Sequence, residues 1–121
     1  QLPPYAQAKL VYCVQGRILD VAVDVRKDSP TFGQSFAVEL TEENRWQLFV
    51  PKGFLHGYSV LSETALVGYK CDDFYNKESE CGIHPLDKTV NIDWRIPAEQ
   101  QLISEKDLNA ISFLELPEII L

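Results

Sequence analysis

The 121-residue sequence has no methionine, only three cysteines, and no long apolar or basic run. Cys13, Cys71 and Cys81 are odd in number and show no C-x-x-C spacing. This pattern indicates neither a disulfide framework nor a zinc site, so reduced thiols are expected. No apolar stretch approaches the roughly 18 residues that cross a bilayer, and no basic segment followed by an apolar stretch opens the chain. We therefore expect a cytoplasmic protein with no membrane partner.

The charge balance argues against a nucleic-acid partner. The chain has eighteen acidic residues and eleven lysines and arginines, so its net charge is −7. No cluster of basic residues could follow a phosphate backbone. A single phosphorylated metabolite remains compatible with this charge. At this length and 45% hydrophobic content, we expect residues 1–121 to form one domain. The lack of methionine and the start Gln1-Leu-Pro-Pro indicate a fragment or a processed product.

Short runs rich in β-branched and aromatic residues recur along the chain and predict strands. Gln15-Gly16 indicates a two-residue hairpin between the first two. The one helix indicated follows Ser104, because Asp107 stands three residues later as in a capping box. Several short strands and one terminal helix predict an all-β barrel or sandwich. The expected strands are Lys9–Val14, Arg17–Val25, Ser35–Leu40, Gln47–Val50, a strand opened by His56, and Thr64–Lys70.

Alternation within two of these strands places polar side chains on defined faces. In the second strand, Asp20 and Asp24 share one face, opposite Leu19 and Val21. One carboxylate could line a cavity, but solvation is the simpler interpretation, above all for Asp24. Tyr69 falls on an apolar face of the last strand, where an aromatic side chain belongs to a core more often than to a reaction site.

The segment Pro51-Lys-Gly53-Phe-Leu-His56-Gly57 lies between two apolar runs and predicts a tight turn between strands. Pro51 fixes φ, Gly53 allows a positive φ, and His56 opens the next strand, where its imidazole can point inward. A histidine packed there with both nitrogens satisfied is an equal alternative. The P-x-G-x-x-H pattern resembles the second half-motif of cupin barrels. The other half-motif, H-x-H with a following Glu, has no counterpart, so we expect no metal.

Five segments occur together in the order, and at nearly the spacing, of one known family. They are Ala8-Lys9-Leu10-Val11, Leu19 to Asp24, Ser29-Pro-Thr-Phe-Gly33, Gln47-Leu with the Pro51 to Gly57 motif, and Tyr69-Lys70 with Phe74-Tyr75. From Gln1 to about Asp107, the chain resembles the dTDP-4-dehydrorhamnose 3,5-epimerases. The resemblance implies a cupin-type jelly-roll barrel, a homodimer, and epimerisation of dTDP-4-keto-6-deoxy-D-glucose at carbons 3 and 5 without cofactor or metal.

The same resemblance implies roles for individual residues. Tyr69 matches the acid that returns a proton, and Asp107 matches the carboxylate partner of the base, although Asp107 also fits a helix-cap acid. Lys9 and His56 match pocket residues that can stabilise a developing oxyanion. The other residues expected to bind or shape the substrate site are Gln1, Asp20, and Phe74, which matches the position beside the thymine base but also fits an exposed loop aromatic folded onto the barrel.

The general base of the family is a histidine that this chain does not contain. It belongs to an Arg-Gly-Leu-His segment just before the glutamine that matches Gln1, so we expect the chain alone to be impaired. A non-catalytic sugar-nucleotide-binding or dimerisation cupin is the alternative from another class, and an epimerase acting on a single carbon is a third possibility. The apolar tail after Asn109 is expected to pack on its own barrel or on a neighbour.

Overall fold

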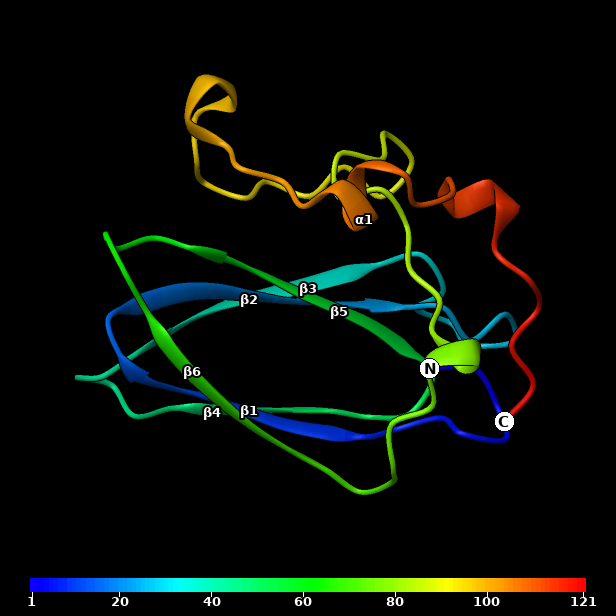
Figure 1. The fold of residues 1–121 in the computed structure, drawn as a ribbon. Helices are drawn as coiled ribbons and strands as arrows, with labels where there is room; N and C mark the ends of the chain where they lie inside the picture. The colour runs from blue at the N-terminus through cyan, green and yellow to red at the C-terminus, as the bar shows by residue number, and fades with distance from the viewer.

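The computed structural model describes residues 1–121, in which six strands form two antiparallel sheets that face each other (Figure 1). One sheet has the strand order β4-β1-β6 and the other β3-β2-β5. Strands that follow each other in sequence lie in different sheets at four of the five connections, which is typical of a jelly roll. The strands are β1 (Lys9–Gln15), β2 (Arg17–Asp24), β3 (Ser35–Thr41), β4 (Gln47–Val50), β5 (Phe54–Val60) and β6 (Leu66–Cys71).

All the predicted strands are present, but β5 begins at Phe54, so the prediction that His56 opens this strand is wrong. The predicted hairpin at Gln15-Gly16 is also wrong. β1 pairs with β4 and β6, whereas β2 pairs with β3 and β5, so this connection leads from one sheet to the other. Gly16 is required for a different reason. Its φ is +81°, and a Cβ there would lie 2.4 Å from the carbonyl oxygen of Thr64. The turn before β5 also has the expected positive φ, +86° at Gly53.

β2 is buried on both faces, and the alternation expected from the sequence is confirmed. Its inward face carries Ile18 and Ala22 into a cluster between the sheets, with Val11 of β1 and Leu40 of β3. Its outward face carries side chains that pack against the C-terminal part of the chain. Seven of the eight β2 residues are buried as a result. The outward-facing cluster consists of Leu19, Val21, Val23, Val25 and Phe113.

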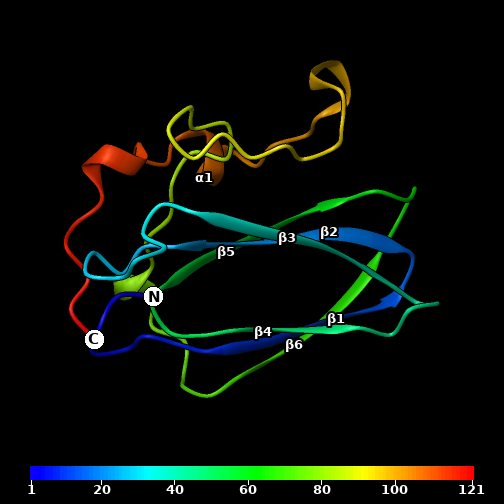
Figure 2. The same cartoon turned by 180° about the vertical axis from the view of Figure 1, so that it is seen from behind.

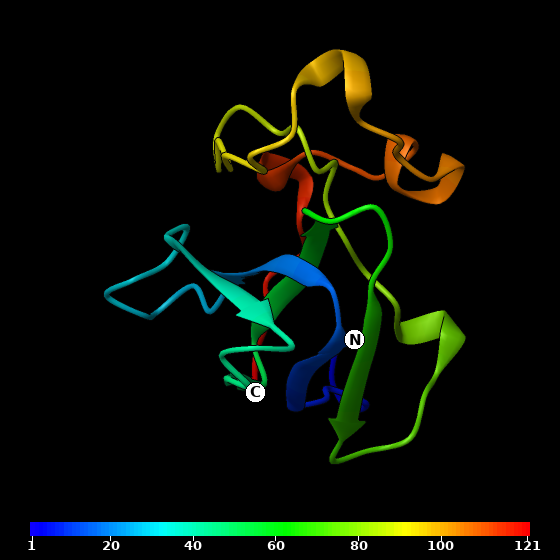
Figure 3. The same cartoon turned by 90° about the vertical axis from the view of Figure 1, so that its left-hand side faces the viewer.

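Residues 83–116 cover the outer face of β3-β2-β5, whereas residues 72–82 pass beside the end of the two sheets, and no corresponding layer covers β4-β1-β6 (Figures 1 and 2). Figure 3, from the end of the sheets, shows the same one-sided cover. The tail packs on its own barrel, one of the two expected outcomes, with the ring centroids of Phe32 and Phe113 5.4 Å apart. No helix combines the length and the apolar character needed to cross a membrane. The helical elements are η1 (Lys77–Ser79), η2 (Ala98–Gln100), α1 (Glu105–Leu108) and η3 (Phe113–Glu115).

The interpretation of Asp24 as a solvated residue is wrong. Its side chain is only 1% exposed and accepts hydrogen bonds from the backbone N–H and guanidinium of Arg26 and from the hydroxyls of Ser29 and Thr31. The hydrogen bonds from Arg26, followed by those from the two hydroxyls, hold the pKa of Asp24 well below its usual range against the opposing effect of burial. Asp24 therefore fixes the loop between β2 and β3.

Candidate active site

A groove of about 1060 Å³ runs along the edge of β5 and beneath the C-terminal segment. This volume is slightly above the usual range for small-molecule sites, about 300 to 1000 Å³. Four of the seven residues singled out from the sequence line it: Gln1, Lys9, His56 and Asp107. They come from the start of the chain, β1, β5 and α1, so the fold brings together residues more than a hundred positions apart.

His56 forms the best-defined polar contact in the groove. Its Nε2 lies 2.6 Å from Oδ1 of Asp20, which is completely buried on the inward face of β2. A carboxylate can only accept, so Nε2 carries a proton when Asp20 is ionised, and Nδ1 is then an acceptor in the neutral ring and a donor in the imidazolium. The other oxygen of Asp20, Oδ2, is buried without a partner. Leaving a buried carboxylate oxygen unpaired costs stability, so the pair is poorly explained by stability alone.

Lys9 and Tyr69 form a second group on the inward face of the other sheet. Tyr69 lies directly opposite Val11 in the pairing of β1 with β6, and residues opposite each other share a face, so Tyr69 and Lys9 both point inward. The Nζ atom of Lys9 is 5.8 Å from the centroid of the Tyr69 ring, within range of a cation–π contact. Tyr69 is 63% exposed, so it is not the core residue that its apolar face suggested.

Asp107 lies in the first turn of α1, an exposed helix of four residues. One of the two hydrogen bonds of the expected capping box is present: Oγ of Ser104 accepts a hydrogen bond from the N–H of Asp107 at 3.2 Å. The reciprocal bond from the N–H of Ser104 to the carboxylate of Asp107, which a complete capping box requires, does not form. The carboxylate therefore remains available to the groove.

Gln1 and Phe74 have surroundings that the sequence did not indicate. The amide of Gln1 is fully engaged, because it accepts from the N–H of Asn76 and donates to the carbonyls of Tyr5 and Phe74. Gln1 thus ties the start of the chain to the loop after β6. The side chain of Phe74 is 87% exposed, so it is neither folded onto the barrel nor in the groove, whereas its neighbour Tyr75 lines the groove.

Several groove residues were not singled out from the sequence. Nζ of Lys106 donates to Oε2 of Glu80 at 2.8 Å, and this contact is the main reason that the pKa of Glu80 is lowered. The only signal for Lys106 is its position next to Asp107. His84, whose Nδ1 accepts from the N–H of Leu86, also lines the groove. No group of three or more His, Cys, Asp and Glu side chains has an arrangement that could hold a metal ion.

Comparison with known proteins gives one consistent family. The sequence model described as dTDP-4-dehydrorhamnose 3,5-epimerase matches residues 1–115. The dTDP-4-dehydrorhamnose 3,5-epimerase of Shigella flexneri is 51% identical over 115 residues, which are 95% of this chain and 62% of that protein. The chain therefore spans a little under two thirds of the length of this relative.

Solved structures agree with the sequence comparison. The crystal structure of dTDP-4-dehydrorhamnose 3,5-epimerase from Elizabethkingia anophelis superposes with a TM-score of 0.93 and 54% identity, over 94% of this chain and 62% of that one. The structure of dTDP-6-deoxy-D-glucose-3,5-epimerase from Legionella pneumophila in complex with dTDP-4-keto-L-rhamnose superposes with a TM-score of 0.90 and 46% identity, over 94% and 60% of the two chains. These neighbours confirm the expected cupin-type jelly roll.

Proposed function

We propose that the protein, which belongs to the dTDP-4-dehydrorhamnose 3,5-epimerase family, converts dTDP-4-keto-6-deoxy-D-glucose to dTDP-4-keto-L-rhamnose. The observation that carries the proposal is the match of residues 1–115 to this family, together with a groove that contains Lys9, His56 and Asp107. The names of the relatives also favour an epimerase over a non-catalytic sugar-nucleotide-binding or dimerisation module.

The reaction needs a base, an oxyanion stabiliser and an acid. Carbons 3 and 5 both lie next to the keto group at carbon 4, and a proton on either carbon is acidic because the electron pair left behind moves onto the carbonyl oxygen as an enolate. In our proposal, the ammonium of Lys9 stabilises this oxygen together with His56 in its imidazolium form, in which Nε2 donates to Asp20 and Nδ1 donates to the oxygen. The buried Asp20 orients His56 through the 2.6 Å contact.

Inversion requires that the proton returns to the face opposite the one it left. We assign this step to the phenol of Tyr69, which shares the inward face with Lys9. Asp107 is the proposed carboxylate partner of the base, which the family resemblance places in a histidine preceding the position of Gln1. Such a partner holds the imidazole in one tautomer and stabilises its protonated form. Gln1, which lines the groove, and Phe74, which is exposed on the loop after β6, are the remaining residues that we propose to contact the substrate.

We further propose that the protein is a homodimer, that dTDP-sugar is its substrate, and that it works in the cytoplasm without cofactor, metal, nucleic acid or membrane. The support for association is the pair of sheets, in which β3, β4, β5 and β6 each have only one hydrogen-bonded neighbour. Open strand edges of this kind favour pairing with another chain. Light scattering after size-exclusion chromatography would show a dimer, and a monomer at all concentrations would argue against this part.

Deuterium exchange at carbons 3 and 5 of dTDP-4-keto-6-deoxy-D-glucose in heavy water tests the proposed reaction. The chain as printed is compared with a version to which the N-terminal segment of the Shigella flexneri relative is joined. We expect exchange at both carbons in the joined version and about 10²- to 10⁴-fold slower exchange in the chain alone, because a general base contributes about that much. Binding of the nucleotide sugar without exchange in either version would favour the binding-module alternative.

A further inference from the structure

His56 lies on a strand that is supported by a neighbour on one side only. In the sheet β3-β2-β5, β5 pairs with β2 alone, so its other edge is open. His56 points inward, where it meets Asp20, and the adjacent Gly57 presents the opposite, outer face of the strand. The position of the imidazole therefore depends on what packs against β5 from behind.

Trp94 packs there and is attached to β5 and to the groove loop by two hydrogen bonds. Its carbonyl oxygen accepts from the hydroxyl of Ser59 on β5 at 2.8 Å, and its indole Nε1 donates to the carbonyl oxygen of Pro85 at 2.7 Å. The indole also packs against the cluster that covers the outward face of β2. Its ring is therefore fixed in position and in orientation.

Gly57 brings the indole into contact with the backbone of β5 directly beside His56. A Cβ at Gly57 would lie 3.3 Å from Cη2 of Trp94, and no other atom comes within 4 Å of that position. This distance is shorter than ordinary van der Waals contact, so a methyl group would displace the ring by a few tenths of an ångström. Gly57 has no positive φ that would otherwise require glycine. The absence of a side chain at this position thus serves the packing of Trp94.

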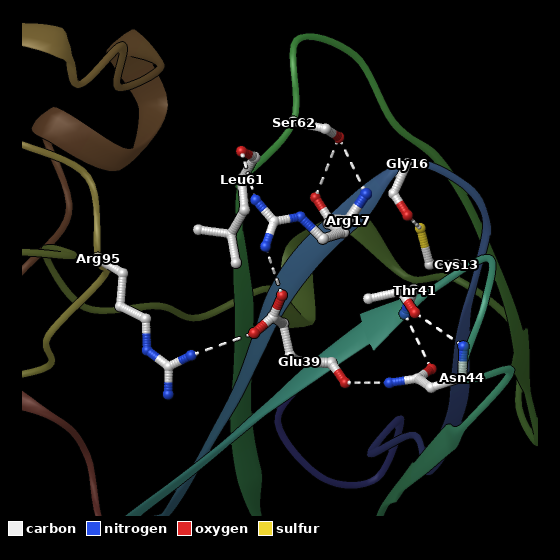
Figure 4. Close-up of polar contacts among 9 residues, drawn as sticks. All are labelled: Cys13, Gly16, Arg17, Glu39, Thr41, Asn44, Leu61, Ser62 and Arg95. Carbon is white, nitrogen blue, oxygen red and sulfur yellow. Dashed lines mark hydrogen bonds and ion pairs between the residues drawn. The ribbon is translucent and has the colours of Figure 1, made fainter.

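The residue after Trp94 anchors the same segment to the far edge of the sheet. Nη1 of Arg95 lies 3.5 Å from Oε2 of Glu39 on β3, and Nη1 of Arg17 on β2 donates to Oε1 of the same carboxylate at 2.9 Å. Figure 4 shows both arginines directed at Glu39. Arg17 also reaches the carbonyl oxygen of Leu61, just after β5. The segment is therefore held at both edges of the sheet, with the indole over β5.

We propose that Trp94 is a positioning residue for His56: its indole, seated on Gly57, supports the open-edged strand β5 from the outer face and keeps the imidazole in contact with Asp20. This inference deepens the proposed function and rests on it for one consequence, a loss of epimerisation when Trp94 is altered. The structural consequence, a loosened contact between His56 and Asp20, can be measured without substrate.

The test is the NMR spectrum of the histidine imidazoles in the chain without substrate. The chain has only two histidines, so His84→Gln assigns the signals. We expect the Nε2 proton of His56 to exchange with water at least about tenfold faster in Trp94→Ala and in Gly57→Ala, because local opening of β5 becomes easier. Trp46→Phe is the matched control, since Trp46 is 61% exposed and distant in sequence, and it should leave this proton unchanged.

A double variant separates positioning from general stability. Trp94→Phe removes Cη2, the atom that a methyl group at Gly57 would meet. Gly57→Ala should therefore accelerate exchange of the His56 Nε2 proton less in the Trp94→Phe background than in the natural one. In the joined version described above, Gly57→Ala should lower kcat about tenfold, and the double variant should recover to within about threefold of Trp94→Phe. The dependence of kcat on pH in the double variant should also return to that of the wild type.

Two results would overturn the inference. One is an unchanged His56 proton in Trp94→Ala and Gly57→Ala while the melting temperature falls, which would give Trp94 a purely stabilising role. The other is additive behaviour of the two substitutions, which would mean that the indole and Gly57 do not act through their contact. If His56 responds as expected but the joined wild-type protein exchanges no deuterium, the proposed function fails while the positioning of His56 by Trp94 stands.

Discussion

The two sheets of the barrel differ in what covers them and in the side chains that they carry. The outer face of β3-β2-β5 lies under residues 83–116, and its inward face holds Asp20 and Asp24 buried. The outer face of β4-β1-β6 has no such cover, and Phe49 there is 61% exposed. The candidate groups on this second sheet, Lys9 and Tyr69, are also accessible. The covered sheet thus carries the buried Asp20 with its partner His56, and the open sheet carries the accessible Lys9 and Tyr69.

The difference between the sheets should be largest when apolar side chains are truncated. Leu19→Ala on β2 should lower the free energy of unfolding by about 2 to 5 kcal/mol, because Leu19 is fully buried and its loss leaves a cavity. Leu66→Ala on β6, where the side chain is 54% exposed, is the matched control and should change it by about 0.5 kcal/mol or less. Urea denaturation measures both. Equal losses would show that the two sheets do not differ in this way.

Removing a carboxylate should have the next largest effect. Asp24→Asn should lower the free energy of unfolding by about 2 kcal/mol, since it weakens charge-assisted hydrogen bonds to a buried oxygen pair. Asp72→Asn is the control in the segment after β6. It keeps an oxygen for the N–H of Ala8 and loses only the 3.7 Å contact with Lys52, so about 0.5 kcal/mol or less is expected.

The same pair of variants predicts a pH dependence with a definite sign. The pKa of Asp24 is lowered in the folded protein, so the unfolded chain binds a proton first as the pH falls. The stabilisation from Asp24 is therefore complete above about pH 5, and it is lost progressively below the unfolded pKa of about 4. The difference between the wild type and Asp24→Asn should shrink from pH 7 to pH 3. A constant difference over this range would contradict the assignment of the charge.

Replacing Lys9 should have the smallest effect on stability but a large effect on the reaction rate. Lys9→Met in the joined version should change the free energy of unfolding by about 0.5 kcal/mol or less, because the ammonium loses only its contact with the Tyr69 ring. Deuterium exchange at carbons 3 and 5 should slow by about 10²- to 10³-fold, the usual cost of removing an oxyanion stabiliser. If Lys9→Met lowers the melting temperature but leaves deuterium exchange unchanged, Lys9 has a structural role instead.

Local signals in the sequence predicted the elements well, and pairing between distant segments accounts for most errors. Alternation placed the faces of β2 correctly, and Ser104 marked the start of α1, because both signals depend on neighbouring residues. The hairpin at Gln15-Gly16 was wrong because a turn motif does not specify which strands its two arms pair with. The family resemblance, rather than periodicity, supplied the jelly-roll topology.

The same distinction applies to the groove. Lys9, His56 and Asp107 were found through the resemblance and do line it. Asp24 was misjudged because its partners lie in a loop that folds back over the carboxylate, which strand alternation does not encode. Trp94 carried no sequence signal at all. Its role depends on a crossing of the outer face of β5 by a segment with no regular structure.

The most direct test of the account is a comparison of exchange with inversion in Tyr69→Phe of the joined version. If Tyr69 returns the proton, the base still removes and exchanges protons on its own face in this variant. Deuterium should then enter carbons 3 and 5 without inversion, so formation of dTDP-4-keto-L-rhamnose falls by about 10²-fold or more while exchange is far less affected. Equal loss of exchange and inversion, or no loss of either, would contradict the assignment of proton return to Tyr69.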